Sequence, residues 1–194
     1  MPKRISSATY APSAQVDGQT LLLAEWRPVR RAVFHLAYFK SRRCPAVSVL
    51  VAGGIGLAVR ASWALVASRD PLRGDPAFYR FFGEAIASGR GYINPWSGDF
   101  TAYYPPGYPY FLGVVTFVQK IFDAISLPMF VSLVQASLGA VTAALAAYLA
   151  GRWWGRRASW VAGLGLALWP NLVAYSSVFL SESLYIFLVV TSLF

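Results

Sequence analysis

Cysteine and histidine are almost absent from this sequence, which contains one residue of each type, Cys44 and His35. A single cysteine cannot form an intrachain disulfide, and the two side chains together cannot complete a Cys/His metal site. If the protein needs a divalent metal, carboxylates would have to bind it. The sequence pattern identifies no particular metal ligand and no certain cofactor. Cys44 lies beside the first long apolar run, where palmitoylation and an inert thiol are the two alternatives.

Charged residues are also scarce. They make up 13% of the chain, whereas soluble domains contain about 25%. Hydrophobic residues make up 57%, and the mean hydropathy is +0.50. These values indicate a membrane protein. The formal net charge of +9 is unevenly placed, because residues 1–44 hold eight basic residues and only two acidic ones, Asp17 and Glu25.

Residues 1–44 are predicted to form a basic, partly disordered cytoplasmic tail. Residues 1–20 are rich in Ser, Ala, Pro, Gln and Gly, a composition typical of disorder. Residues 21–40 have the pattern of a short amphipathic helix lying on the inner membrane surface, although Pro28 interrupts it. Basic residues beside an apolar span favour contact with anionic membrane lipid. No nucleic-acid-binding fold accompanies the charge, so we expect no nucleic-acid partner.

Four apolar runs predict an all-α fold, a polytopic transmembrane helical bundle in the cell membrane. They cover approximately residues 45–67, 129–150, 158–174 and 183–194, with an outer loop at 68–128. The first run has 23 residues, enough to cross a hydrocarbon core of ~30 Å. Lys40, Arg42 and Arg43 precede it and place the N-terminus in the cytoplasm. The last run reaches only ~18 Å, so we expect an incomplete span and a truncated chain.

The first apolar run contains an arginine and a cluster of glycines. A charge at the depth of Arg60 normally faces a cavity or a partner, and the alternative is a side chain that snorkels to the outer interface. The glycine-rich segment 51–57 has no strand before it and no Lys-Ser/Thr after it, so it does not match a phosphate-binding loop. We interpret these glycines as a site of close helix packing.

The outer loop is predicted to begin with a short amphipathic helix at 76–88. Asp75 suits the N-cap, Pro76 the first helical position, and Gly89 the stop after the last turn. One helical face is apolar, formed by Phe78, Phe81, Phe82, Ala85 and Ile86. On the other faces we expect Arg80 and Glu84 to form an exposed i,i+4 pair. An aromatic loop follows at 90–107.

The apolar segment 108–125 decides the topology. If it crosses the membrane, the basic turn 151–157 lies outside, which breaks the positive-inside rule. If it is a second juxtamembrane helix, the basic turn lies inside, and Asp75 and Glu182 face the same outer compartment. We favour the second arrangement.

Several motifs occur in an order that resembles one family. They are Arg60 late in the first span, Gly74-Asp75-Pro76-x-x-Tyr79, Gly89-Arg90-Gly91-Tyr92, Tyr104-Pro105-Pro106-Gly107-Tyr108-Pro109, Gly151-Arg152-Trp153-Trp154-Gly155-Arg156-Arg157 and Leu180-Ser181-Glu182-Ser183-Leu184. Their order and spacing are similar to those of the GT-C superfamily of integral-membrane glycosyltransferases, especially the protein O-mannosyltransferase and aminoarabinose-transferase branch. The resemblance covers about residues 50–194 and makes 45–194 the N-terminal part of such a transmembrane domain.

This resemblance implies transfer of a sugar from a polyprenyl-phosphate donor to an acceptor on the extracytoplasmic face. Asp75 matches the acidic residue of the first outer loop, which acts as general base on an acceptor hydroxyl or, in some branches, as a metal ligand. Glu182 matches the acidic residue of the second outer loop. Many relatives carry two adjacent acids at the first site, whereas this sequence has Pro76 beside Asp75.

Other residues in the outer loop are candidates for substrate binding. Cations can stabilise a leaving phosphate and aromatic rings can stack on sugars, which points to Arg73, Tyr79, Arg90, Tyr92 and Tyr104. Each candidate also has a structural alternative: Asp75 as a helix cap, Glu182 as a polar end of a span, and the aromatic residues as an interfacial belt. The alternative functions are a transporter or flippase that uses Arg60 in a pathway, or a non-catalytic membrane fragment.

Overall fold

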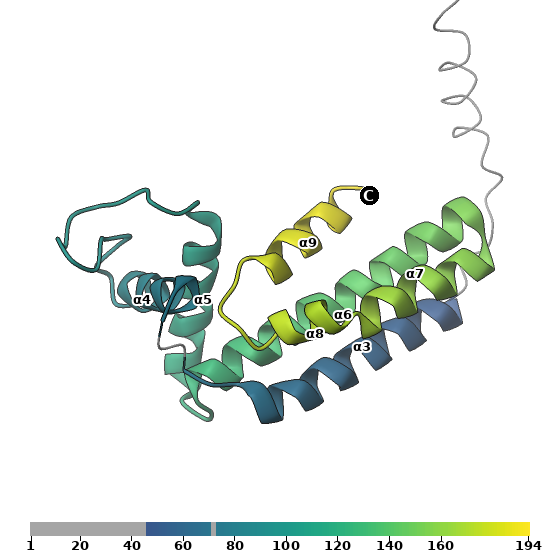
Figure 1. The fold of residues 1–194 in the computed structure, drawn as a ribbon, viewed down its shortest axis with the longest axis horizontal. Coiled ribbons are helices and arrows are strands. Elements are labelled where there is room, and N and C mark those ends of the chain that lie inside the picture. Colours follow the sequence, from purple (N-terminus) through teal and green to yellow (C-terminus); the bar gives the residue numbers. More distant parts are fainter. Residues whose placement is uncertain (1–45, 71–72) are drawn as a thin grey trace, which may run out of the picture. The chain divides into compact units, whose positions relative to one another are not determined.

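The computed structural model describes residues 46–70 and 73–194, so the predictions for the tail 1–44 lie outside the described residues. Within them the chain is all-α, as predicted, and its only strand-like pairing is an isolated bridge between Ile93 and Phe100. The helices, drawn in Figure 1, are α3 (Ala46–Ala67), α4 (Asp75–Ala87), α5 (Gly107–Phe122), α6 (Leu127–Trp154), α7 (Arg156–Leu168), α8 (Pro170–Tyr175) and α9 (Glu182–Thr191). All of them belong to one compact unit, Ser41–Phe194.

Two of the described helices are long and apolar enough to cross a membrane. They are α3, with 22 residues, and α6, with 28. A crossing helix needs about 20 apolar residues, and α5 has 16 while α9 has 10. The part of the chain that the structure describes therefore supports membrane association through two candidate spanning helices.

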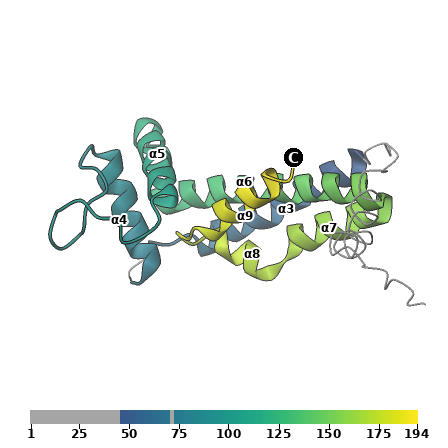
Figure 2. The ribbon, with the colours of Figure 1, turned by 90° about the horizontal axis from the view of Figure 1, so that it is seen from above.

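Helices α3, α6 and α7 lie side by side (Figures 1 and 2). They meet through small side chains. The buried face of α3 repeats at every fourth position and consists of Ser48, Ala52, Gly56, Arg60 and Ala64. A Cβ atom added at Gly53 would lie 3.3 Å from the Cβ of Ala144, and one at Gly56 would lie 3.5 Å from the Cα of Ala140. The interpretation of segment 51–57 as a helix-packing site is therefore confirmed. Small residues bring the backbones close enough for contact over their whole length.

Gly163 lies where all three helices converge. A Cβ atom at this position would be 2.7 Å from the Cβ atoms of both Ala52 and Ala147. Near this crossing the Oγ atoms of Ser48 and Ser159 are 2.6 Å apart, and Ser159 Oγ also donates to the carbonyl of Ala147 at 2.8 Å. The three-helix contact therefore combines close packing with hydrogen bonds between helices.

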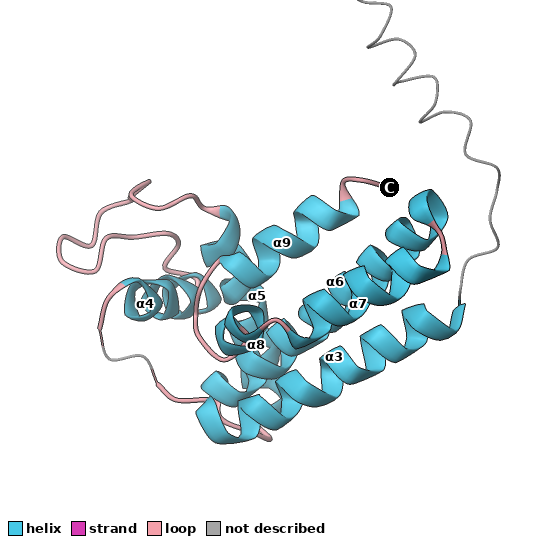
Figure 3. Cartoon of the chain, turned by 45° about the vertical axis from the view of Figure 1, so that its right-hand side comes forward, coloured by secondary structure: helices cyan, strands magenta, loops and turns pink. Residues whose placement is uncertain are grey.

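The predicted span at 158–174 is two helices in the structure, α7 and α8, with a break at Trp169 (Figure 3). Trp169 has extended backbone angles, φ −62° and ψ 116°. Pro170 lacks an N–H and its ring clashes with the carbonyl four residues earlier, so α7 cannot continue through it. The residue before a proline is also driven out of the helical region, which explains the conformation of Trp169.

Helices α4 and α5 form a tightly packed pair. A Cβ atom added at Gly83 would lie 2.9 Å from Leu112 Cβ, and one at Gly113 would lie 2.5 Å from Ile86 Cγ2. Gly89 follows α4 with φ +77°, a conformation suited to glycine, so the predicted stop is confirmed. The Arg80 Nε atom lies 2.9 Å from Glu84 Oε1, and Arg80 also pairs with Asp70.

A second core fills the space between α4, α5, the start of α6 and the segment before α9. It is mostly aromatic and consists of Tyr79, Phe82, Tyr92, Tyr108, Leu112, Val115, Val131 and Phe179. The predicted apolar face of α4 packs on it, with Phe82 and Ala85 buried and Phe78, Phe81 and Ile86 at its margin. This core positions the outer-loop residues that the sequence singled out.

Gly163→Ala should destabilise the three-helix contact, because the new methyl group would overlap Ala52 and Ala147. Overpacking of this kind costs about 1–3 kcal/mol. Gly165→Ala is the matched control in the same helix, since nothing lies within 4 Å of its added Cβ. Thermal unfolding in detergent micelles should show a lower midpoint for Gly163→Ala and an unchanged or higher one for Gly165→Ala. Equal midpoints for the two variants would contradict this packing.

Candidate functional site

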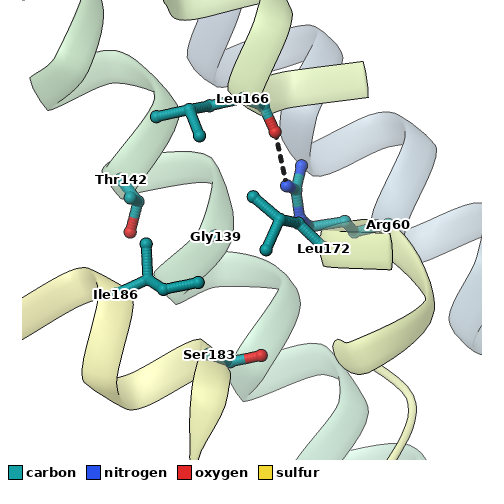
Figure 4. Close-up of a pocket in the computed structure, with 7 residues that line it drawn as sticks. All are labelled: Arg60, Gly139, Thr142, Leu166, Leu172, Ser183 and Ile186. Carbon is teal, nitrogen blue, oxygen red and sulfur yellow. Dashed lines mark hydrogen bonds between the residues drawn. The ribbon is translucent and has the colours of Figure 1, made fainter. Parts of the chain in front are cut away.

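Arg60 is buried and does not snorkel to the interface. Its side chain is 2% exposed. Nη1 donates to the carbonyl of Ala167 at 2.8 Å, and Nη2 donates to that of Leu166 at 2.8 Å (Figure 4). Pro170 cannot donate to Leu166, four residues earlier, so this carbonyl is left without a helical partner. Arg60 therefore caps the broken C-terminus of α7.

The space around Arg60 is small. A cavity of about 20 Å³ lies beside it, lined also by Gly139, Thr142, Leu166, Leu172, Ser183 and Ile186 (Figure 4). A Cβ atom at Gly139 would lie 2.5 Å from Arg60 Nε, so this glycine makes room for the guanidinium. The cavity can hold about one water molecule, and the observed contacts of Arg60 are structural.

Asp75 is the first residue of α4, and the N-cap is Gly74, with φ 70°. The prediction that Asp75 occupies the N-cap is therefore wrong by one position. Gly74 supplies the first accepting carbonyl, and its backbone angles favour glycine over a residue with a side chain. The Asp75 carboxylate instead accepts a hydrogen bond from the Tyr104 hydroxyl, with Oδ1 and Oη 2.7 Å apart. Asp75 is exposed, so this carboxylate is accessible to a ligand.

The hydrogen bond to Asp75 fixes the ionisation of Tyr104. This bond, with smaller contributions from desolvation and from the negative charge of Asp75, raises the pKa of the Tyr104 hydroxyl from 10.0 to about 12. Tyr104 therefore stays protonated at neutral pH and remains a hydrogen-bond donor to the carboxylate.

Tyr92 holds the backbone of Tyr104. The Tyr92 hydroxyl donates to the Tyr104 carbonyl at 2.9 Å and accepts from the Tyr104 N–H at 3.2 Å. Tyr92 is 6% exposed and its ring packs on Phe82 with centroids 4.7 Å apart. Tyr92 is predicted to bind substrate. In the structure it is buried and holds the backbone of Tyr104 in place.

Tyr79 brings the two predicted acidic residues into one neighbourhood. Burial raises the pKa of its hydroxyl, a hydrogen bond with Ser181 partly offsets this, and the negative charges of Asp75 and Glu182 raise it further. The Tyr79 ring lies against both Tyr104 and Tyr108, with centroid distances of 5.1 and 4.9 Å. The charges of Asp75 and Glu182, from distant parts of the sequence, therefore both act on Tyr79.

Glu182 opens α9 with one carboxylate oxygen lacking a partner. Its Oε2 atom is buried and makes no hydrogen bond with any residue that the structure describes. An unpaired buried carboxylate oxygen is unfavourable unless a ligand or a proton occupies it. Glu182 is therefore the second candidate, beside Asp75, for contact with a substrate.

Gln135 joins the elements of this site, and the sequence reasoning missed it. The residue is fully buried. Its Oε1 accepts from the Tyr108 hydroxyl at 3.0 Å, and its Nε2 donates to the carbonyls of Val178 and Ser176 at 2.8 and 3.2 Å. An amide inside the apolar run 129–150 was the available signal, because a polar residue at such a position normally has partners.

A pocket of about 260 Å³, here called the groove pocket, opens beside these tyrosines. Its lining is Tyr79, Pro105, Gly107, Tyr108, Ser181, Leu184, Tyr185 and Leu188. The lining combines the hydroxyl groups of Tyr79 and Ser181 with leucines of α9. Pockets with an apolar wall and a few convergent polar groups are typical ligand sites.

The two predicted cations do not join this cluster. Arg73 is exposed and immediately precedes Gly74. Arg90 is exposed as well, and its Nε donates to Ser88 Oγ at 3.1 Å while the guanidinium lies over the Phe81 ring at 5.7 Å. Among residues 46–70 and 73–194, no group of three or more His, Cys, Asp or Glu side chains is arranged to hold a metal ion.

Tyr104→Phe should remove a pH-dependent contribution to stability. The pKa of Tyr104 is raised from 10.0 to about 12, so the contribution is fully present below pH 10 and lost as the pH rises through about 12. We expect Tyr104→Phe to unfold at a lower temperature than the wild type below pH 10, with the difference shrinking toward pH 12. Tyr103→Phe is the control, since Tyr103 is 80% exposed. A difference that stays constant to pH 12 would count against the Tyr104–Asp75 bond.

Comparison with known proteins identifies no relative of this chain. No family model matches the chain, and neither a curated protein nor a solved structure matches it significantly. The resemblance to the glycosyltransferase superfamily therefore rests on the sequence motifs alone. The structural features that bear on function are the group of tyrosines and the two acidic residues.

Proposed function

We propose that the chain carries part of the catalytic face of a membrane glycosyltransferase that transfers a sugar from a polyprenyl-phosphate donor to an acceptor hydroxyl. The observations that carry this proposal are the exposed Asp75 carboxylate bonded to Tyr104, whose ring packs on Tyr79, and the charges of Asp75 and Glu182 that both act on Tyr79, which lines a pocket with an apolar wall. Two acidic residues from separate loops near one pocket match the arrangement implied by the motifs. A soluble enzyme would fit the composition less well.

In this reaction Asp75 is the general base. Its carboxylate removes the proton of the acceptor hydroxyl as the hydroxyl oxygen attacks the anomeric carbon of the donor. The bond between that carbon and the phosphate oxygen breaks, and the polyprenyl phosphate leaves with the electron pair. The Tyr104 hydroxyl, bonded to Asp75 Oδ1, orients the carboxylate and leaves Oδ2 for the substrate. A role for Asp75 as ligand to a divalent metal is the alternative within the same family.

The groove pocket suits the donor. Leu184 and Leu188 provide an apolar wall for the start of a lipid chain, and Tyr79 and Ser181 provide hydroxyl groups in the same pocket. Burial raises the pKa of the Tyr108 hydroxyl, and the negative charge of Glu182 raises it further. The predicted cations Arg73 and Arg90 are both exposed, before and after α4, and neither lines the groove pocket.

The membrane arrangement that we propose is a polytopic bundle with a cytoplasmic N-terminus. Helix α5 has 16 residues and packs against α4, which supports its placement as a juxtamembrane helix. With α5 outside the hydrocarbon core, α3, α6 and the α7–α8 segment cross in succession, and Asp75 and Glu182 then lie on one side. Their common neighbour Tyr79 supports this arrangement. The transporter alternative used Arg60 as part of a pathway, whereas Arg60 is occupied by the carbonyls of α7.

Asp75→Asn in the intact membrane protein should lower sugar transfer by at least about a hundredfold, because general base catalysis contributes a factor of about 10² to 10⁴. Transfer is measured from a radiolabelled polyprenyl-phosphate sugar to membrane acceptors. Asp123→Asn is the matched control, since Asp123 is exposed and has φ 39°, a conformation that asparagine tolerates. Normal transfer by Asp75→Asn would exclude this role, and an equal loss in Asp123→Asn would show that the effect is unspecific.

A cysteine at position 154 tests the membrane arrangement. Trp154 lies at the end of α6 and is 64% exposed. In a Cys44→Ser background, Trp154→Cys should react with a membrane-impermeant maleimide only after the cytoplasmic side is opened, because the positive-inside rule places the basic turn there. Reaction in intact cells would require α5 to cross the membrane.

A further inference from the structure

A second pocket lies beside the Tyr104 ring, which does not line the groove pocket. It has a volume of about 260 Å³ and is here called the loop pocket; its lining is Phe78, Phe82, Asn94, Pro95, Trp96, Thr101, Tyr103 and Tyr104. Tyr79 lines only the groove pocket, and its ring lies 5.1 Å from that of Tyr104. Each pocket is therefore lined by one of two neighbouring tyrosine rings, and this pair of rings is here called the tyrosine wall.

The loop pocket has rigid aromatic walls. Trp96 packs against Phe78 with centroids 5.2 Å apart, and Tyr103 packs against Tyr104 with centroids 4.9 Å apart. Trp96 is nevertheless 79% exposed and Tyr103 80% exposed. Each ring is thus supported on one side by the protein and open on the other, which leaves its surface available to a flat ligand.

Hydrogen-bonding groups lie among these rings. Asn94 Oδ1 accepts from the N–H groups of Trp96 and Ser97 at 2.8 and 3.3 Å, so its amide nitrogen is left as a donor. Thr101 Oγ1 accepts from the Tyr103 N–H at 3.3 Å and keeps its own O–H as a donor. The backbone of this turn is closed by the bond from Asn94 N to the Asp99 carbonyl at 2.7 Å. The donors and the aromatic rings are therefore held in one frame.

We propose that the loop pocket binds a sugar ring of a carbohydrate acceptor. Aromatic faces beside amide and hydroxyl donors suit a pyranose, which has one apolar face and a rim of hydroxyl groups. Purely lipid-facing aromatics would not need Asn94 and Thr101 in the same pocket, and exposed Ser97 and Asp99 at the loop tip are unfavourable in lipid.

The position of the loop pocket explains how an acceptor could meet the base. Tyr104 lines this pocket with its ring and bonds Asp75 with its hydroxyl. A sugar hydroxyl at the Tyr104 edge is thereby directed to the carboxylate, while the donor occupies the groove pocket at the other ring of the tyrosine wall. This part of the inference rests on the proposed function, whereas sugar binding itself does not.

Binding is tested with the full chain in lipid nanodiscs and three soluble probes, maltotriose, mannotriose and chitotriose. Saturation-transfer difference NMR should show transfer to the sugar ring protons of at least one probe. Trp96→Ala should weaken this binding by about tenfold, the usual effect of removing a central aromatic contact. Trp154→Ala, which removes an exposed tryptophan at the far end of α6, should leave it unchanged.

The outcomes separate the two proposals. Asp75→Asn should retain sugar binding and lose sugar transfer. Binding that depends on Trp96, together with normal transfer by Asp75→Asn, would uphold the loop pocket and exclude the proposed catalytic role. If no probe binds, or if binding persists in Trp96→Ala, the loop pocket is not a carbohydrate site. The Trp96 contribution to fluorescence is the difference between the wild type and Trp96→Ala. If brominated lipid quenches this contribution and no sugar binds, the loop lies at the membrane surface instead.

Discussion

The buried amide of Gln135 is the contact on which the candidate site depends. It bonds Tyr108 of α5 with its oxygen and the carbonyls of Ser176 and Val178 with its nitrogen. A buried amide left without partners costs about 1–3 kcal/mol per unsatisfied group. The segment before α9 therefore has one favoured position against α6, and this position carries Ser181 and Glu182 to Tyr79.

Arg60 has a similar part within the three-helix contact, where both Nη atoms have partners and Nε makes no hydrogen bond with any residue that the structure describes. Its charge is buried, and its guanidinium satisfies the carbonyls that the break before Pro170 leaves free. The break and the arginine therefore belong together, since each would be unfavourable alone. Gly139 belongs with them, because a larger residue would occupy the space of the guanidinium. The resulting rigid frame of α3, α6 and α7 supports the more exposed aromatic half of the molecule.

In that aromatic half, a chain of hydrogen bonds leads from Tyr92 through Tyr104 to Asp75. Tyr92 bonds the backbone of Tyr104, and Tyr104 bonds Asp75. Because Tyr104 remains protonated, the carboxylate keeps one oxygen occupied and one available. The groove pocket and the loop pocket, at the two rings of the tyrosine wall, offer different surfaces, the first rich in leucine and the second in aromatic rings. Such a division suits a reaction between a lipid-linked molecule and a polar one.

The sequence by itself determined the helical class, the bounds of α3 to within one residue, and the existence of α4 with its stop at Gly89. These features depend on local hydrophobic periodicity and on glycine conformation, which act over a few residues. It also singled out Asp75 and Glu182 as the residues to examine. The N-cap was misassigned because both Gly74 and Asp75 suit that position, and local preference does not separate them.

Only the tertiary structure decided how distant residues meet. The bonds of Gln135, the capping of α7 by Arg60 and the approach of Asp75 and Glu182 to Tyr79 all join segments far apart in the chain. Periodicity states which face of a helix is buried, and not which partner buries it, because many packings satisfy the same apolar pattern. Buried polar side chains favour the packings in which they form hydrogen bonds. In this protein the hydrogen bonds of Gln135 hold the elements of the candidate site together.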